Sequence, residues 1–222
     1  MIEVHRLHLT DVTPAPHLPW ARPMFPVFAY LVVHPDGPVL VDSGVGLGNP
    51  VIDELYSPVH HDLDEALREH AVAVTDIETV ITSHLHFDHC GQNNRFGHAE
   101  VLVQRAEVEA AKAKLYTVPE WAFPPELDLT IVDGDQDVRA GIRTVATPGH
   151  TPGHQSVLLE DDDGTRTVVC CQASWTANSF AEGTLGDEGW DELAGAASVT
   201  KLRSLEPDRV LFSHARETWP PR

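Results

Sequence analysis

The sequence predicts an α/β sandwich, with mixed β-sheets inside and helices outside. Three observations predict this class. Short runs of β-branched residues alternate with segments of helical composition. Several of these runs are joined by local turns, as in hairpins. The chain has 222 residues, which is enough for one well-buried domain and too few for two comfortable ones. We therefore expect one domain over residues 1–222, because helices must cover the apolar faces of such sheets.

The first half of the chain supplies five of the expected strands. They are residues 2–9, 27–33, 39–41, 79–82 and 99–104. A turn at 34–38 makes a hairpin of the second and third strands. The proline-rich stretch 14–26 is expected to be a loop. Residues 62–70 and 106–115 have helical composition and are expected to be helices.

The second half supplies five more strands, which we expect at residues 129–132, 142–146, 156–160, 167–171 and 209–212. A turn at 133–135 is expected to join the first two, and a turn at 161–164 to make a hairpin of the next two. Residues 191–205 form an expected helix with leucines near one face. The aromatic stretch 121–125 is expected to be irregular.

The composition argues against nucleic acids and anionic membranes as binding partners. The formal charge is −19, so the chain lacks the surplus of lysine and arginine that nucleic acids and anionic membranes require. We see no signal peptide and no apolar run long enough to span a membrane. Three cysteines, two of them adjacent, do not make a disulfide framework. These features favour a cytoplasmic protein with a small-molecule substrate.

The segment His84-Leu85-His86-Phe87-Asp88-His89 carries four side chains that can bind a metal within six positions. Side chains two apart in an extended segment point to the same side, so three of them can converge. Imidazole nitrogen and carboxylate oxygen suit a borderline ion such as zinc, with iron or manganese as alternatives. The preceding strand would place these ligands at its carboxyl end, where α/β proteins carry their chemistry.

Further histidines follow other strand-like runs. The stretch Thr147-Pro148-Gly149-His150-Thr151-Pro152-Gly153-His154 comes after the strand expected at 142–146. His214 comes after the strand expected at 209–212. A chance cluster would not be joined by histidines in matching contexts, so the pattern indicates a metal centre built from distant segments.

This motif set resembles the metallo-β-lactamase superfamily over nearly the whole chain, which implies an αββα sandwich of two mixed sheets flanked by helices. Residues 83–91, 103–105 and 147–156 most resemble those of the N-acyl-homoserine lactone lactonases. The resemblance implies one metal site at His84, His86 and His150, and a second at Asp88, His89 and His214. It also implies that Asp42 orients the ligands, and that His154 is a supporting or pocket residue.

Two positions depart from the lactonase pattern. Gln172 stands where the family has an aspartate that bridges both ions, and Gln offers one good metal-binding oxygen and no charge. Trp175 stands where the lactonases have a tyrosine that polarises the substrate. Three outcomes stay open: both ions bind without the carboxylate bridge, one binds tightly and one weakly, or the centre is degraded. Strand alternation predicts that Cys171, next to Gln172, points away from the site.

The resemblance implies a metal-dependent hydrolase of a lactone, ester or thioester, in which metal-held hydroxide attacks the carbonyl. Asp88, His214 and Trp175 are the expected catalytic side chains, with Asp88 able to pass a proton to the leaving group. The alternatives are a non-hydrolytic cyclase or lyase and a binding protein with a degraded centre. A nuclease is disfavoured by the charge. The oligomeric state stays open, with a homodimer among the options.

The aromatic side chains supply candidates for a pocket wall. We expect most of them to belong to the core and two or three to touch a ligand. The candidates are Trp20, Phe25, Phe28, Trp121, Phe123, Trp175 and Phe180.

Overall fold

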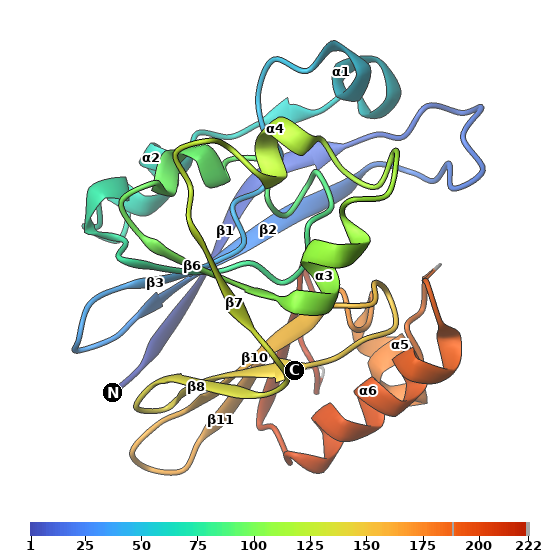
Figure 1. Cartoon of the computed structure of the whole chain (residues 1–222). Coiled ribbons are helices and arrows are strands. Elements are labelled where there is room, and N and C mark those ends of the chain that lie inside the picture. The colour runs from blue at the N-terminus through green and yellow to red at the C-terminus, as the bar shows by residue number, and fades with distance from the viewer. Residues whose placement is uncertain (188, 221–222) are drawn as a thin grey trace.

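Two mixed β-sheets packed face to face form the centre of the fold in a computed structural model, which describes residues 1–187 and 189–220 (Figure 1). The seven-stranded sheet has the order β4-β1-β2-β3-β5-β6-β7. Its strands are β1 (Glu3–Val12), β2 (Phe25–Val33), β3 (Val39–Val41), β4 (Val59–His60), β5 (Thr79–Ile81), β6 (Glu100–Gln104) and β7 (Leu129–Val132). Strands β3, β5, β6 and β7 pair in parallel, whereas β4, β1, β2 and β3 pair antiparallel.

The second sheet has five strands in the order β12-β11-β10-β9-β8. They are β8 (Gln136–Arg139), β9 (Ile142–Ala146), β10 (Gln155–Glu160), β11 (Arg166–Cys171) and β12 (Arg209–Phe212). Only the β11–β12 pair in this sheet is parallel. A buried cluster joins the facing sides of the two sheets, with Tyr30 and Ile81 from one and Val157 and Leu211 from the other.

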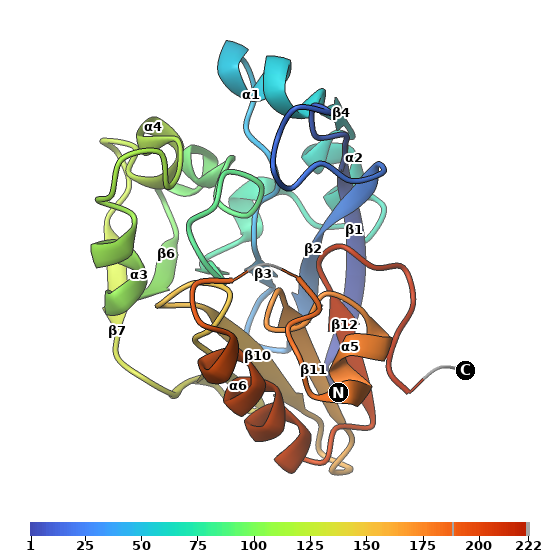
Figure 2. The same ribbon diagram turned by 90° about the vertical axis from the view of Figure 1, so that its right-hand side faces the viewer.

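Helices cover both outer faces (Figure 2). The helices are α1 (Pro50–Tyr56), α2 (Leu63–Arg68), α3 (Arg105–Ala110), α4 (Pro119–Ala122), α5 (Ala177–Glu182) and α6 (Glu192–Ser204). Leu67 of α2 packs on the seven-stranded sheet. Phe180 of α5 and Leu202 of α6 pack on the five-stranded sheet. The layering is therefore helix, sheet, sheet, helix, and the predicted αββα class is confirmed.

Several predicted elements differ from the structure. The helix expected at 106–115 ends at Ala110, and Leu115 has a left-handed φ of 66°. A tertiary contact overrides helical composition here, because the chain turns back to place Tyr116 against Glu107. The stretch 121–125 is partly helical, since Pro119 begins α4.

The connection expected as a simple turn at 133–135 also differs. The chain crosses there from β7 in one sheet to β8 in the other, and β8 then pairs with β9. The polar composition of β8 hid this edge strand from the sequence analysis. The short helices α1 and α5 were missed as well, although Asn49 and Thr176 cap their first turns.

One end of the sandwich gathers the segments with candidate ligands. Asp42 follows β3 and the histidine-rich loop follows β5, which is the parallel neighbour of β3. In the other sheet, His150 comes after β9, Gln172 directly after β11, and His214 shortly after β12. Carboxyl ends of strands that run in the same direction meet at one edge, so this arrangement brings distant residues together. Among the described residues, no helix is long and apolar enough to cross a membrane.

Candidate metal centre

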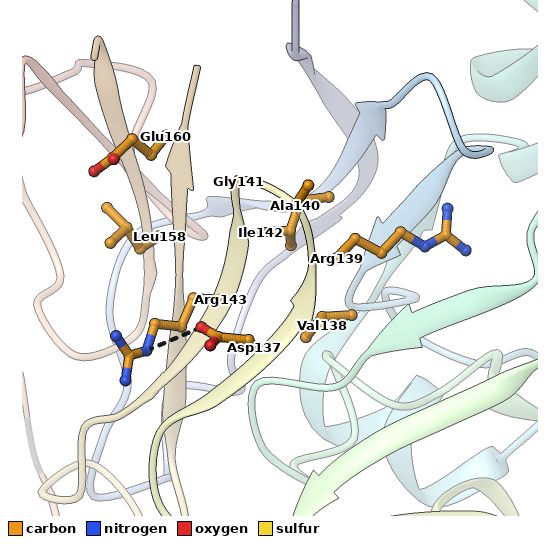
Figure 3. Close-up of a pocket in the computed structure, with 9 residues that line it drawn as sticks. All are labelled: Asp137, Val138, Arg139, Ala140, Gly141, Ile142, Arg143, Leu158 and Glu160. Atoms are coloured by element: carbon orange, nitrogen blue, oxygen red, sulfur yellow. Dashed lines mark ion pairs between the residues drawn. The ribbon is translucent and has the colours of Figure 1, made fainter. Parts of the chain in front are cut away.

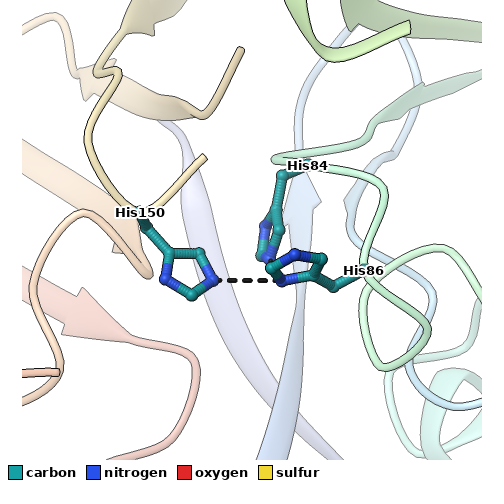
Figure 4. A group of neighbouring side chains, drawn as sticks. All are labelled: His84, His86 and His150. Carbon is teal, nitrogen blue, oxygen red and sulfur yellow. Dashed lines mark hydrogen bonds between the residues drawn. The ribbon is translucent and has the colours of Figure 1, made fainter. Parts of the chain in front are cut away.

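His84, His86 and His150 form the first group of converging side chains (Figure 4). Nε2 of His84 and Nε2 of His150 each lie 3.1 Å from Nδ1 of His86. Nitrogens that share a tetrahedral zinc ion lie about 3.3 Å apart, given zinc–nitrogen distances of about 2.0–2.1 Å. The three rings are therefore spaced as ligands of one ion would be. His84 is fully buried, whereas the other two are partly exposed.

Asp88, His89 and His214 form the second group, and all three are buried. Nε2 of His89 lies 3.3 Å from Nε2 of His214, and each nitrogen lies 3.6 Å from Oδ2 of Asp88. The rings of His84 and His89 lie 4.0 Å apart between centroids, so the two groups are adjacent. The structure thus brings the six side chains predicted as ligands into the two groups that the motif implies.

The pKa shifts of four of these side chains fit a metal centre. Burial and the neighbouring His150 lower the pKa of His86 to about 3, and burial lowers the pKa of His214 to about 4. Burial also lowers the pKa of His84 well below its usual value. Although burial disfavours its charge, Asp88 has a lowered pKa because His89 and His214 are close. Neutral imidazoles and an ionised carboxylate are the forms that bind a divalent ion.

Asp42 forms a hydrogen bond with His89, a member of the second group. Its Oδ2 lies 2.8 Å from Nδ1 of His89, and it accepts hydrogen bonds from the backbone and hydroxyl of Ser83 at 2.7 and 2.8 Å. Burial lowers the pKa of His89, but the charges of Asp88 and Asp42 outweigh burial and raise it. Asp42 has a left-handed φ of 63°, uncommon for a residue with a side chain. The contact between Asp42 and His89 is the one that an orienting role would require, and that role stays a prediction.

Gln172 reaches the second group from the five-stranded sheet. Its Oε1 lies 3.3 Å from Nε2 of His214, and its backbone N–H donates to Nε2 of His154 at 3.1 Å. Nδ1 of His154 lies 2.8 Å from the hydroxyl of Thr147. The ring nitrogens of His154 are thus engaged in holding Gln172 and the Thr147 loop, which suits the supporting role we expected. Cys171 turns into the core between the sheets, as strand alternation predicted.

Glu107 is a residue that the sequence analysis missed. This fully buried side chain accepts four hydrogen bonds. Oε1 accepts from the backbone of Leu85 at 2.8 Å and from the hydroxyl of Tyr116. Oε2 accepts from the hydroxyl of Thr151 at 2.7 Å and from the backbone of Gly153 at 3.1 Å. Glu107 therefore ties the loop with His84 and His86 to the loop with His150.

Gly153 permits this connection between the two loops. A Cβ at this position would lie 2.0 Å from the backbone nitrogen of Glu107, closer than any real contact. The sequence carried a signal for the glycine, in the repeated Thr-Pro-Gly-His, but none for the glutamate. Glu107 lies in a segment rich in Ala, Glu and Lys, the usual composition of a solvent-exposed helix face.

Two of the seven candidate aromatics lie against a candidate ligand. The Trp175 ring stacks on His214 with centroids 4.4 Å apart, and Phe25 meets the same histidine edge-on at 5.1 Å. The guanidinium of Arg22 lies 4.6 Å from the centroid of Trp175 and bonds to Asp187 at 2.6 Å. The other five aromatics pack in the core or away from these ligands: Trp20, Phe28, Trp121, Phe123 and Phe180.

A separate groove of about 480 Å³ lies on the β8–β9 hairpin (Figure 3). It is lined by Asp137, Val138, Arg139, Ala140, Gly141, Ile142, Arg143, Leu158 and Glu160, and Asp137 pairs with Arg143 at 3.5 Å. None of the candidate ligands lines it. The chemistry that the histidines can support therefore belongs to the strand ends and not to this groove.

Comparison with known proteins decides the family. A model of the "Metallo-beta-lactamase superfamily" matches residues 22–214, which include both groups of candidate ligands. The chain belongs to this superfamily. The resemblance inferred from the histidine motifs is thereby confirmed.

Several curated relatives within the superfamily are lactonases. An N-acyl homoserine lactonase of a Bacillus species is 34% identical over 204 residues, covering 85% of this chain and 81% of the relative. The lactonase AiiA of Bacillus thuringiensis subsp. kurstaki is 32% identical with the same coverage. These relatives are hydrolases, and the chain is lactonase-like in sequence.

The fold of this chain is also similar to that of a solved structure. That protein is an N-acyl homoserine lactone hydrolase with the product N-hexanoyl-L-homoserine bound at its catalytic metal centre. The TM-score is 0.79 at 27% identity, with 96% of this chain and 92% of that chain covered. The chain thus shares both the sequence pattern and the fold of this superfamily member.

Proposed function

We propose that this protein is a metal-dependent hydrolase of N-acyl homoserine lactones or closely related lactones, with other esters and thioesters as the wider class. The observation that carries the proposal is the meeting of two three-donor groups at one edge of the sandwich. The product-bound relative supports a lactone as the substrate, since its product is an opened N-acyl homoserine. Fold alone would not identify a substrate, so the proposal depends on this site and on the lactonase relatives together.

His84, His86 and His150 would hold one ion, and Asp88, His89 and His214 the other. Zinc suits these donors, and iron or manganese are alternatives. Ions bound there would supply a Lewis acid for the carbonyl oxygen and a water of lowered pKa. Gln172 offers its Oε1 beside His214 and adds no charge, so we infer that the second group binds its ion more weakly than the first.

The chain's own groups would carry the remaining roles. Asp88 is buried and its lowered pKa keeps it ionised, so its carboxylate starts without a proton. It could then relay a proton from the attacking water to the leaving alkoxide. The indole N–H of Trp175 can donate to a substrate oxygen but cannot titrate as a phenol does. Phe25 and Trp175 flank His214 with apolar surface, which would exclude water from that side of the reacting carbonyl.

The test combines metal counting with turnover. Protein saturated with zinc, manganese or iron is assayed for ring opening of N-hexanoyl homoserine lactone by the acid that is released. We expect turnover that a chelator abolishes, and a loss of about 100-fold or more in kcat for Asp88→Asn. His98→Asn is the matched control, because His98 is exposed and lies outside both ligand groups.

Two results would contradict the proposal. A protein that binds its ions but opens neither lactones nor simple esters would be a non-hydrolytic metalloenzyme such as a cyclase or lyase. A protein that takes up none of the three metals would have a binding role instead. Both alternatives matter because the resemblance implies that Gln172 stands where the family has an anionic bridge.

A further inference from the structure

A second set of metal-binding side chains lies at the outer edge of the seven-stranded sheet, outside the catalytic groups. His8 and Asp11 belong to β1, and His61 directly follows β4, which pairs with β1. Nε2 of His8 lies 2.9 Å from Oδ1 of Asp11, and Nε2 of His61 lies 3.2 Å from Oδ2 of the same carboxylate. One donor atom from each residue lies within 4.8 Å of the other two.

A β-bulge creates this grouping. Residues three apart on a regular strand point to opposite faces. The register between β1 and β2 shifts between His8 and Thr10, so Leu9 is an extra residue. Leu7 before the shift, the extra residue Leu9, and Thr10 and Val12 after the shift are all buried. His8 and Asp11 are therefore both left on the partly exposed side.

His61 is held beside this pair by the backbone. Its N–H donates to the carbonyl of Leu9 at 2.8 Å, so the residue after β4 is anchored at the bulge itself. The rings of His8 and His61 lie 4.3 Å apart between centroids. Two of the three donors thus lie on β1, and the third belongs to the residue after β4, whose backbone is hydrogen-bonded to β1. Fixed donors bind an ion with less loss of side-chain entropy than free ones.

We propose that His8, Asp11 and His61 form a binding site for a divalent transition ion, separate from the catalytic centre. Two imidazoles and one carboxylate are donors that zinc, nickel and copper accept, and solvent can complete the coordination. Occupation would clamp the β4 edge to β1, and it would stabilise the fold by mass action.

The charged surroundings set the affinity. Burial opposes ionisation of Asp11, but hydrogen bonds from His61 and His8 outweigh it and lower the carboxyl pKa. The guanidinium of Arg216 lies 3.9 Å from Oδ1 of Asp11, and this cation weakens the attraction for another. Its side chain is largely exposed and can move into solvent. We expect binding in the micromolar range, far weaker than at a buried site with more ligands.

The experiment counts zinc on the full-length protein after its catalytic centre has been saturated. Wild type and His61→Asn are dialysed against the same micromolar zinc buffer and analysed for metal per chain. His70→Asn is the matched control, because His70 stacks on His5 of the same strand with ring centroids 4.0 Å apart. We expect wild type and His70→Asn to carry one zinc more than His61→Asn.

A second measurement locates the ion without relying on a difference in counts. In ¹H–¹⁵N spectra of the imidazoles, the ring signals of His8 and His61 should shift with the added zinc, and those of His5 and His70 should not. The proposal is overturned if His61→Asn binds as much zinc as wild type, or if the two rings stay unshifted. Asp11 of β1 would then serve only as a hydrogen-bond partner of His61, the residue that follows β4.

Discussion

Two buried acidic residues contact the two groups of candidate ligands in different ways. Asp42 contacts a candidate ligand directly, because its Oδ2 meets Nδ1 of His89. Glu107 bonds instead to residues next to the ligands, through the backbone of Leu85 and the hydroxyl of Thr151. Asp42 can therefore set the orientation and basicity of one imidazole, whereas Glu107 sets the spacing between two loops.

This difference separates two kinds of positioning. A group that bonds to a ligand ring acts on one ion and should leave the other nearly unchanged. A group that joins the loop of His84 and His86 to the loop of His150 acts on both loops at once. Its loss should therefore lower the free energy of unfolding before it alters one ion selectively. The variants below test this distinction, beginning with the largest expected effect.

Replacing Glu107 by Gln should cause the largest loss. An amide has one acceptor oxygen and two donors, so its NH₂ would face the donors that now bond to one carboxylate oxygen. We expect the free energy of unfolding to fall by about 3 kcal/mol or more, since buried donors lose their partners. Urea unfolding of the metal-saturated protein measures it.

Tyr116→Phe is the control for this variant, because it removes a single hydroxyl donor to Glu107. Its cost should be about 1 kcal/mol. Equal unfolding midpoints for Glu107→Gln and wild type would show that the two loops do not depend on this side chain.

Replacing Asp42 by Asn should act on one ion. The amide keeps the size of the side chain but loses the charge that His89 Nδ1 faces. We expect affinity at the group of Asp88, His89 and His214 to fall about 10–100-fold, the usual effect of losing such a partner. The ion at His84, His86 and His150 should remain. Titration against a series of zinc buffers resolves the two steps.

Ser83→Ala is the comparison variant, since it removes one hydroxyl donor to Asp42 and keeps the contact between Asp42 and His89. It also removes the hydroxyl that lies 3.0 Å from Nδ1 of His84, so a small change at the first ion is expected in this variant alone. If Asp42→Asn lowered the affinity for both ions by a small and equal factor, Asp42 would not act selectively on the second ion. Its role would then resemble that of Glu107.

The same two residues show what the sequence could and could not predict. Asp42 was singled out because it ends a recognisable apolar strand in a context shared with the family, and the structure places it 2.8 Å from His89. The histidine motifs predicted the fold and the two groups of side chains that converge, whose role as ligands stays a prediction. Glu107 was not found, because its burial depends on the loop that carries Gly153 folding against it. Local composition carries no information about that contact.

The missed secondary structure has a related cause. Strand β8 is polar and lies at the edge of its sheet, so only its pairing with β9 defines it. The helix expected at 106–115 was shortened by the contact between Tyr116 and Glu107. Long apolar runs were predicted well because burial dictates them, whereas short polar elements are fixed by tertiary partners.

Gln172→Asp tests the same group of candidate ligands that Asp42 contacts, namely Asp88, His89 and His214. A carboxylate near His214 would add a charge that offsets the repulsion between two dications. We expect the second ion to bind about tenfold more tightly, or about 1.4 kcal/mol. Gln172→Asn has the same length as the aspartate without the charge and is the matched control. Equal affinities for the Asp and Asn variants would show that charge at this position does not govern the second ion.

Trp175→Tyr should give the smallest change, because it alters a group beside His214 and leaves every candidate ligand in place. A phenol can donate a hydrogen bond to a substrate oxygen and also titrate, whereas the indole can only donate. We expect kcat for lactone opening to rise about threefold, or about 0.6 kcal/mol, with KM nearly unchanged. Trp175→Phe keeps an aromatic ring without any donor and should lower kcat. If both variants change KM alone, the ring at this position serves only to pack against the substrate and His214, and polarisation must come from the second ion.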